Sequence, residues 1–136
     1  MGVKSLAPML EKDFQTKFNK WVKYSIKNTA VFELKITHGK SIPFAAVQEH
    51  QEHALKLAKH KKIIFKIPDA GWQNPFDSFQ IAGSESYVVV MFDNRRATKD
   101  FYMIDIDVWL NEKATSVRKS LIEERANELG THCVLP

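Results

Sequence analysis

The sequence predicts a single α/β domain over residues 1–136, with a mixed central β-sheet flanked by helices. Segments with helical spacing of apolar residues alternate along the chain with segments that have strand character. The run SYVVVMF (residues 86–92) is almost continuously apolar, which is typical of a strand covered on both faces. A length of 136 residues suits one hydrophobic core, and the sequence has no internal repeat or low-complexity linker.

The first two predicted elements are an amphipathic helix and a strand. Residues 9–26 carry apolar side chains at helical spacing with lysines on the opposite side, and the Asn28-Thr29 pair ends this helix. The strand AVFELKIT (residues 30–37) follows and is closed by the turn His38-Gly39-Lys40.

A second helix is predicted to begin near Ser41 and to run to about residue 60. Ser41 suits the N-cap and Pro43 suits the first turn. Gln48 and Gln51 fall on the same stripe as the apolar residues that are expected to face inward. A buried amide needs hydrogen-bond partners, so these two glutamines are notable. The apolar residues of that stripe are Phe44, Val47, Leu55 and Ala58.

The second half of the chain predicts three strands and a final helix. KKIIFKI (residues 61–67) is a strand, residues 68–79 form turns with a short extended piece, and DNRRATKD is a basic loop. FYMIDIDVWL (residues 101–110) is predicted as a strand. The final helix spans about 116–129 and ends at Gly130.

The composition excludes several classes of protein. No apolar run approaches the roughly 20 residues of a membrane helix, and the first ten residues make a poor signal peptide. The single cysteine, Cys133, cannot form an internal disulfide, which fits a cytoplasmic location. The chain has no Walker loop, no G-x-G-x-x-G and no zinc-ligand spacing.

The net charge of +4 is compatible with a solvated lysine surface and with a polyanionic partner. Six basic residues could contact phosphates without reading sequence, and such contacts would make binding salt-dependent. They are Lys40, Lys61, Lys62, Arg95, Arg96 and Lys99. Trp72, Phe76 and Phe79 could stack on unpaired bases if exposed, or form part of the core.

The strand FELKIT places Glu33 and Lys35 on one face, opposite Phe32, Leu34 and Ile36. An unpaired charge inside a strand costs several kcal/mol. The two residues therefore form an ion pair or lie on a half-exposed edge strand, or they belong to a hydrolytic site. In that site a carboxylate binds a divalent metal, and an ammonium group sits beside the attacking water. One carboxylate is a weak Mg²⁺ site, so this hypothesis needs a second acid.

Glu33-Leu34-Lys35 matches the E-x-K half of the PD-(D/E)xK nuclease motif. FELKIT, HGKSIPF and VQEHQEHALKLA together resemble the core of RecU-type Holliday junction resolvases, in which an E-x-K strand leads into a helix with a His-Gln pair, here His50-Gln51. YVVVMF and FYMIDIDVWL are similar to the two strands that close that fold. The resemblance covers about residues 30–110.

This resemblance implies a restriction-endonuclease-like core and a metal-dependent endonuclease that hydrolyses phosphodiester bonds of branched DNA in recombination and repair. It further implies Mg²⁺ or Mn²⁺, a homodimer, and a location in the cytoplasm, or in the host cytoplasm for a phage protein. Glu33 would bind the metal, with the backbone carbonyl of Leu34 as a further ligand. Lys35 would activate the water, and Gln51, with Gln48 one turn earlier, would position the phosphate or the water.

The chain departs from the family pattern because no Asp stands between the first predicted helix and the E-x-K strand. Asp77, in Pro-Phe-Asp followed by a strand, a Gly turn and another strand, is the first candidate for the second metal ligand, and Asp69 is the second. Aspartate is also common in turns for its local hydrogen bonds. Glu11 could assist the metal from the first helix or simply face the helix dipole. Without a second acid, the alternative is a non-catalytic nucleic-acid-binding protein on the same fold.

Overall fold

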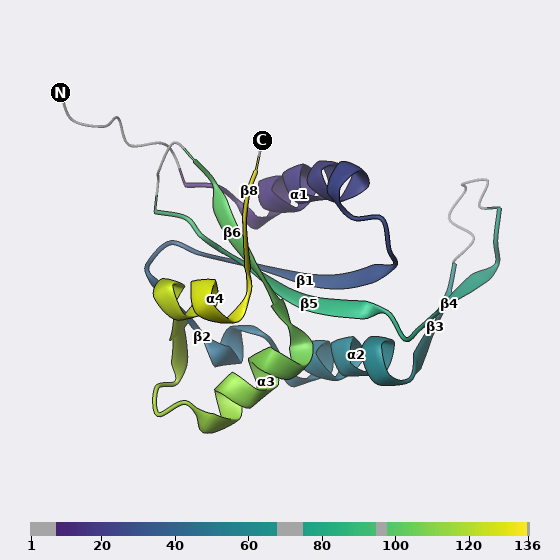
Figure 1. The fold of residues 1–136 in the computed structure, drawn as a ribbon. Helices are drawn as coiled ribbons and strands as arrows, with labels where there is room; N and C mark the ends of the chain where they lie inside the picture. Colours follow the sequence, from purple (N-terminus) through teal and green to yellow (C-terminus); the bar gives the residue numbers. More distant parts are fainter. Residues whose placement is uncertain (1–7, 68–74, 95–97, 136) are drawn as a thin grey trace.

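The computed structural model describes residues 8–67, 75–94 and 98–135. It shows a mixed α/β fold in which a mixed central sheet has helices on both faces (Figure 1). Within the described residues this sheet has four strands in the order β1-β5-β6-β8. The strands are β1 (Ala30–Thr37), β5 (Glu85–Phe92), β6 (Asp100–Asp105) and β8 (Thr131–Val134).

The two strands β1 and β5 run parallel, in a register from Ala30↔Glu85 to Thr37↔Phe92. Parallel neighbours need a crossover connection, and α2 (Glu49–His60) lies in that connection. β6 pairs antiparallel with β5 and with β8. β5 is buried on both faces from Val88 to Phe92, as its apolar sequence predicted.

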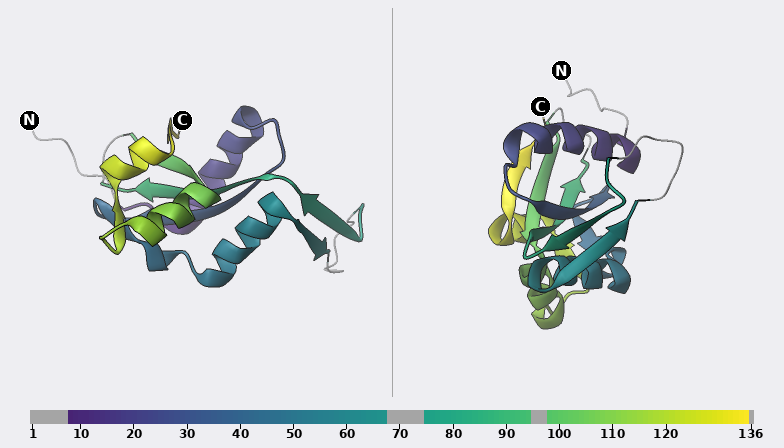
Figure 2. Two further views of the ribbon diagram at one scale, coloured as in Figure 1. Left: turned by 60° about the horizontal axis from the view of Figure 1, so that its bottom comes forward. Right: turned by 90° about the vertical axis from the view of Figure 1, so that its right-hand side faces the viewer.

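One face of the sheet is covered by α1 (Glu11–Ser25), which lies across the strands (Figures 1 and 2). Phe14 and Phe18 of this helix are almost fully buried and meet Phe101 of β6 edge-on or tilted. Burying an aromatic side chain contributes about 2–3 kcal/mol, so these two rings account for the position of the helix.

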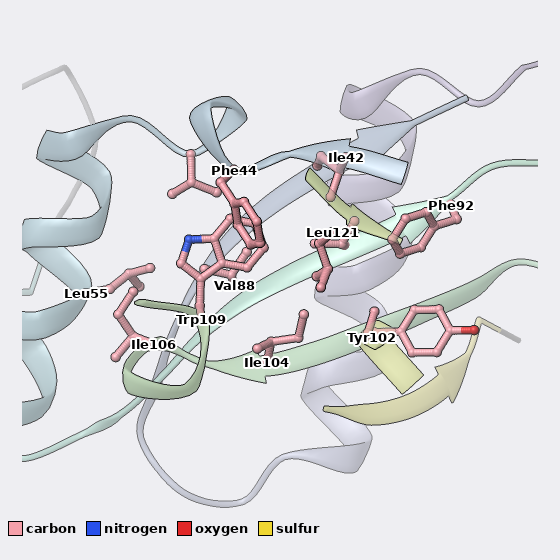
Figure 3. Close-up of a cluster of buried hydrophobic side chains, with 13 residues drawn as sticks. Ile42, Phe44, Leu55, Val88, Phe92, Tyr102, Ile104, Ile106, Trp109 and Leu121 are labelled. Carbon is pink, nitrogen blue, oxygen red and sulfur yellow. The ribbon is translucent and has the colours of Figure 1, made fainter. Parts of the chain in front are cut away.

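The opposite face is covered by α2 and α3 (Ile106–Thr115). Trp109 lies at the centre of this second core, with its ring edge-on to Phe44 (Figure 3). Its indole Nε1 donates a hydrogen bond of 3.0 Å to the buried carboxylate of Glu52. The second core is therefore held by apolar burial and by a satisfied polar contact between Glu52 of α2 and Trp109 of α3.

Two short strands, β2 (Ser41–Pro43) and β7 (Ser120–Ile122), pair antiparallel beside this core. A 3₁₀ turn (Phe44–Ala46) follows β2, and α4 (Glu123–Leu129) follows β7. The predicted helix from Ser41 to residue 60 is therefore wrong in its first turns, because Ser41 and Pro43 pair with residues 122 and 120. Helix α2 begins only at Glu49.

The hairpin of β3 (Lys62–Lys66) and β4 (Ser78–Ala82) projects from the end of the body beyond α2 (Figures 1 and 2). After β4 the chain enters β5 through Gly83, whose φ of +60° is in the left-handed region that favours glycine. Figure 1 shows that β4 and β5 follow one another without a reversal of direction.

The predicted strand over residues 101–110 is correct only to Asp105. The side chain of Asp105 accepts hydrogen bonds from the backbone N–H groups of Asp107 and Val108, so it caps α3. The predicted helix over 116–129 is divided into β7 and α4, and β8 was not predicted.

Gly130 permits the close packing of β8 against β6. A Cβ atom at this position would lie 2.6 Å from the carbonyl oxygen of Met103. Gly130 follows α4 directly, as predicted. No helix in the described residues is long and apolar enough to cross a membrane.

Candidate active site

The side chains of β1 alternate between the two cores, as the sequence predicted. Phe32, Leu34 and Ile36 pack in the core beneath α1. Val31 packs in the core beneath α2, and Glu33 follows it on that face. The strand therefore presents its acid and its base towards α2.

Glu33, Lys35 and Gln51 meet at the start of α2. The Nε2 atom of Gln51 donates a hydrogen bond of 2.8 Å to Oε1 of Glu33. The ammonium nitrogen of Lys35 lies 3.2 Å from the same oxygen. The side chains of Lys35 and Glu33 are 17% and 26% exposed, so the pair is shielded but open to solvent.

Gln51 is held in one orientation by its second hydrogen bond. Its Oε1 atom accepts from the backbone N–H of Gln48 at 2.9 Å, next to the first turn of α2. Because the amide oxygen is used by an N–H donor, the amide NH₂ must face Glu33. The helix start therefore fixes the donor that reaches the carboxylate. Gln48 is itself exposed, and its backbone holds Gln51.

Within the described residues, both polar contacts of the Glu33 carboxylate use Oε1. Oε2 is the atom that could bind a metal ion, since carboxylate oxygens are ligands that Mg²⁺ prefers. Lys35 adds a positive charge next to this position. The arrangement also fits the alternative without a catalytic site, namely an ion pair on an edge strand. Glu33 and Lys35 form an ion pair, and β1 lies at the edge of the four-stranded sheet of the described residues.

Asp77, the first candidate for the second acid, does not lie beside Glu33. It immediately precedes β4, and its backbone carbonyl accepts from Ile67 N–H at the outer end of the hairpin. Ser78 and Ala82 are about 13 Å apart along β4 at 3.3 Å per residue. Glu33 lies further along, three residues into β1 from the end at which Ala30 pairs with Glu85. The expected hairpin exists, but it carries Asp77 away from the site.

Two other proposed metal ligands have different outcomes. Glu11 is an exposed residue at the start of α1, on the opposite side of the sheet from the face of Glu33. The sheet therefore separates the two carboxylates, and the proposed contribution of Glu11 is not supported by the fold. Leu34 lies between Glu33 and Lys35 in β1, with its side chain in the core beneath α1. Asp69 lies outside the described residues.

The predicted phosphate contacts divide into exposed and paired lysines. Lys40 follows β1, Lys61 ends α2 and Lys62 begins β3, and all three are exposed. Lys99 is only 14% exposed and lies 2.9 Å from the buried carboxylate of Asp93, so it is an internal ion-pair partner.

Arg95, Arg96 and Trp72 lie outside the described residues. Phe76 and Phe79 are exposed, so the alternative that they belong to the core is wrong.

A second polar cluster, which sequence reasoning did not recognise, joins the end of α2 to the start of α3. The ammonium group of Lys59 lies 2.7 Å from carboxylate oxygens of both Asp105 and Asp107. These contacts raise the pKa of Lys59 and lower the pKa of Asp107. The sequence placed both aspartates on a strand, and the cap motif at Asp105 was the available signal for a helix start.

A surface cavity of about 550 Å³ lies beyond the end of β1, away from α2. The imidazole of His132 stacks on the ring of Tyr102 at 5.1 Å, and the Tyr102 hydroxyl donates to Glu123. No sequence motif indicated this cavity. The residues that line it include Lys40, Asp100, Tyr102, Glu123, Asn127 and His132.

The described residues contain no cluster of three or more His, Cys, Asp or Glu side chains that could hold a metal ion. Glu33 is therefore not part of such a cluster within the described residues. Comparison of the chain with family models, with curated proteins and with solved structures gave no match.

Proposed function

We propose that the protein is a metal-dependent endodeoxyribonuclease with a restriction-endonuclease-like core, and that it hydrolyses phosphodiester bonds in branched DNA. The observation that carries the proposal is the meeting of Glu33, Lys35 and Gln51. The sequence resemblance concerns these three positions, and a structural ion pair alone would not require the fixed amide of Gln51.

The roles follow from the chemistry of each group. Glu33 supplies a hard oxygen ligand for Mg²⁺ or Mn²⁺, and such an ion supplies charge stabilisation at the phosphate and a more acidic water. Lys35 lies beside Glu33 and stabilises negative charge on the reacting phosphate. Gln51 keeps Oε1 of Glu33 oriented by its hydrogen bond, so it is a positioning residue.

The reaction is a hydrolysis with a simple balance. The oxygen of a water molecule forms a bond to phosphorus and releases a proton. The bond from phosphorus to the leaving sugar oxygen breaks, and that oxygen takes up a proton. One phosphodiester and one water give one phosphomonoester and one hydroxyl end.

Exposed lysines supply the binding surface that such an enzyme needs. Lys61 and Lys62 lie at the junction of α2 and the projecting hairpin, and Lys40 lies at the other end of β1. Phosphate contacts of this kind give affinity that falls steeply with salt.

A non-catalytic nucleic-acid-binding protein is the second candidate function. The observation that favours it is that the described residues hold no group of three or more His, Cys, Asp or Glu side chains that could bind a metal ion. Binding by lysines would persist without metal and without cleavage.

The test is an assay of cleavage and binding on the same substrates. The protein is incubated with a four-way junction, linear duplex and single-stranded DNA, in Mg²⁺, in Mn²⁺ and in EDTA. We expect cleavage of the junction only with a divalent metal, and loss of cleavage in Glu33→Gln with binding retained. Tight, salt-dependent binding without cleavage in either metal would establish the second candidate instead.

A further inference from the structure

The projecting hairpin of β3 and β4, called the arm below, has one apolar face. Phe65 pairs with Phe79 and Ile63 pairs with Ile81, so these four side chains share that face. The rings of Phe65 and Phe79 stack at 5.2 Å and are 43% and 47% exposed. Only the base of the arm lies beside α2, and its outer part extends from the body (Figure 2).

The opposite face of the arm carries two lysines together with polar and apolar side chains. It carries Lys62 and Lys66, with Ile64, Gln80 and Ser78. An isolated two-stranded hairpin is marginally stable in water, and stacked exposed aromatic rings indicate a surface that is covered by a partner. A nucleic acid would be favoured by lysines on the aromatic face, but the lysines lie on the other face. The apolar face therefore fits a protein surface.

The strand that carries Glu33 has an unused edge. In the described part of the chain β1 pairs with β5 alone, so its other edge offers backbone donors and acceptors to another strand. An edge of this kind accepts an added strand or hairpin. The open edge and the arm are thus complementary features of the same chain.

A single chain cannot bring the two features together at the active site. The arm leaves the body at the end where β5 begins, and it holds Asp77 at its outer end. Glu33 lies three residues into β1 from that same end of the sheet. Asp77 is therefore on a segment that points away from the body of its own chain.

We propose that a second copy of this chain completes the site: the arm of each copy docks along the open β1 edge of the other, and Asp77 from one chain joins Glu33 of the other as the second carboxylate. The inference rests on the proposed function for its chemistry. The exchange is reciprocal, so a two-fold dimer holds two composite sites. Docking covers Phe65 and Phe79 and leaves Lys62 and Lys66 outward for DNA.

A mixed dimer tests the exchange directly. Glu33→Gln chains and Asp77→Asn chains, each with its own affinity tag, are expressed together and the mixed dimers are purified through both tags. Each variant alone is expected to be inactive. The mixed dimer is expected to regain about half of the wild-type cleavage, because one of its two sites then has both carboxylates. If each site were formed within one chain, the mixed dimer would stay inactive, and that result would overturn the proposal.

Cross-linking gives a readout that does not depend on activity. In a Cys133→Ser background, one tagged chain carries Glu33→Cys and the other carries Asp77→Cys. A short bismaleimide is expected to join the two differently tagged chains. The matched control replaces Glu33→Cys by Asp13→Cys, an exposed residue on α1 across the sheet, and should give no product. A chain that stays monomeric, or that links equally through Asp13→Cys, would contradict the exchange.

The outcomes separate the two proposals. Specific cross-linking of the cysteine variants, together with a wild-type protein that cleaves nothing, supports arm exchange and overturns the nuclease. A wild-type protein that cleaves while the mixed dimer stays inactive supports the nuclease and overturns the exchange. The double variant Phe65→Ser, Phe79→Ser is expected to be monomeric. If this double variant stays dimeric but loses binding to single-stranded DNA, the aromatic face binds bases, and the exchange is overturned.

Discussion

The side-chain amide of Gln51 donates a 2.8 Å hydrogen bond to the carboxylate of Glu33, and this contact joins the start of α2 to the interior of β1. The two residues are 18 positions apart in the sequence. Glu33 is therefore bound by an amide of fixed orientation, because the amide oxygen of Gln51 accepts at the same time from the backbone N–H of Gln48.

Replacing Gln51→Ala should lower stability by about 1–2 kcal/mol, because a part-buried carboxylate and a helix-start N–H each lose a partner. Urea unfolding measures the change. His50→Ala, at an exposed position of the same helix turn, is the control and should have little effect. An equal loss in both variants would show that the change reflects helix propensity and not the contact with Glu33.

Replacing Gln51→Glu should make stability depend on divalent metal. The new carboxylate would face Glu33, and two like charges in a shielded site repel one another. The melting temperature is expected to fall in EDTA and to recover in Mg²⁺ or Mn²⁺ by more than that of the wild type. A metal response identical to that of the wild type would argue against a cation position at Glu33.

The buried carboxylate of Glu52 should be important for stability and not for DNA binding. It accepts from Trp109 Nε1 and from the Lys113 ammonium group at 3.0 and 2.9 Å. Glu52→Ala leaves both donors without this acceptor and is expected to cost about 3 kcal/mol. Glu52→Gln keeps an acceptor and should cost less, and Glu49→Gln at an exposed position should cost a few tenths. Equal unfolding midpoints for the three variants would contradict this assignment.

Lys99 should behave as a structural residue in spite of its basic sequence context. Lys99→Met removes one of the charged partners of the buried Asp93 carboxylate and should lower stability by about 2–3 kcal/mol. Lys40→Met, at an exposed position, should leave stability unchanged but reduce the salt dependence of DNA binding by about one ion. The reverse pattern would show that Lys99 faces the phosphates.

The contact between Lys59 and Asp107 predicts a small stabilisation of the folded protein that is lost at acid pH. Hydrogen bonding from Lys59 holds the pKa of Asp107 below its usual value of 3.8. A depressed carboxyl pKa gives stability that is present above the usual pKa and is lost as pH falls through the folded value. The wild type should therefore be more stable than Asp107→Asn at neutral pH, and the difference should disappear as pH falls from 3.8 through the lowered pKa of folded Asp107.

The magnitude of this difference is limited by exposure. The Asp107 side chain is 42% exposed, so solvent screening keeps the difference below about 1 kcal/mol. Salt at 1 M should reduce it further. A difference that persists unchanged at acid pH would mean that Asp107 stabilises by packing and not by charge.

Local sequence patterns were sufficient for the elements whose structure depends on their own residues. The β1 strand and the alternation of its side chains agree with the prediction, because an apolar-flanked alternating segment has few other solutions. The buried β5 strand also agrees, and Phe44, Val47 and Leu55 are buried as expected, although Phe44 and Val47 precede α2. Gln48, placed on the same inward stripe, is exposed. The contact between Glu33 and Gln51 could be predicted, because both positions belong to faces that point into the same core.

The errors occur where long-range pairing decides the structure. Ser41 and Pro43 have helix-start character, but they pair with β7, nearly eighty residues later in the chain. Asp105 follows four buried strand residues, and only its side-chain cap on α3 ends the strand. Asp77 was expected to fold back to Glu33, but the direction of a hairpin relative to the body depends on packing that no local motif encodes.

The role of Glu33 as the metal-binding carboxylate is tested most directly by the single-turnover rate of four-way-junction cleavage in Mg²⁺, measured for the wild type and for Glu33→Gln. We expect cleavage by the wild type that EDTA abolishes, and a rate for Glu33→Gln that is lower by about a hundredfold or more, with junction binding unchanged. Cleavage by Glu33→Gln at the wild-type rate would contradict the assignment of Glu33 as the metal-binding carboxylate.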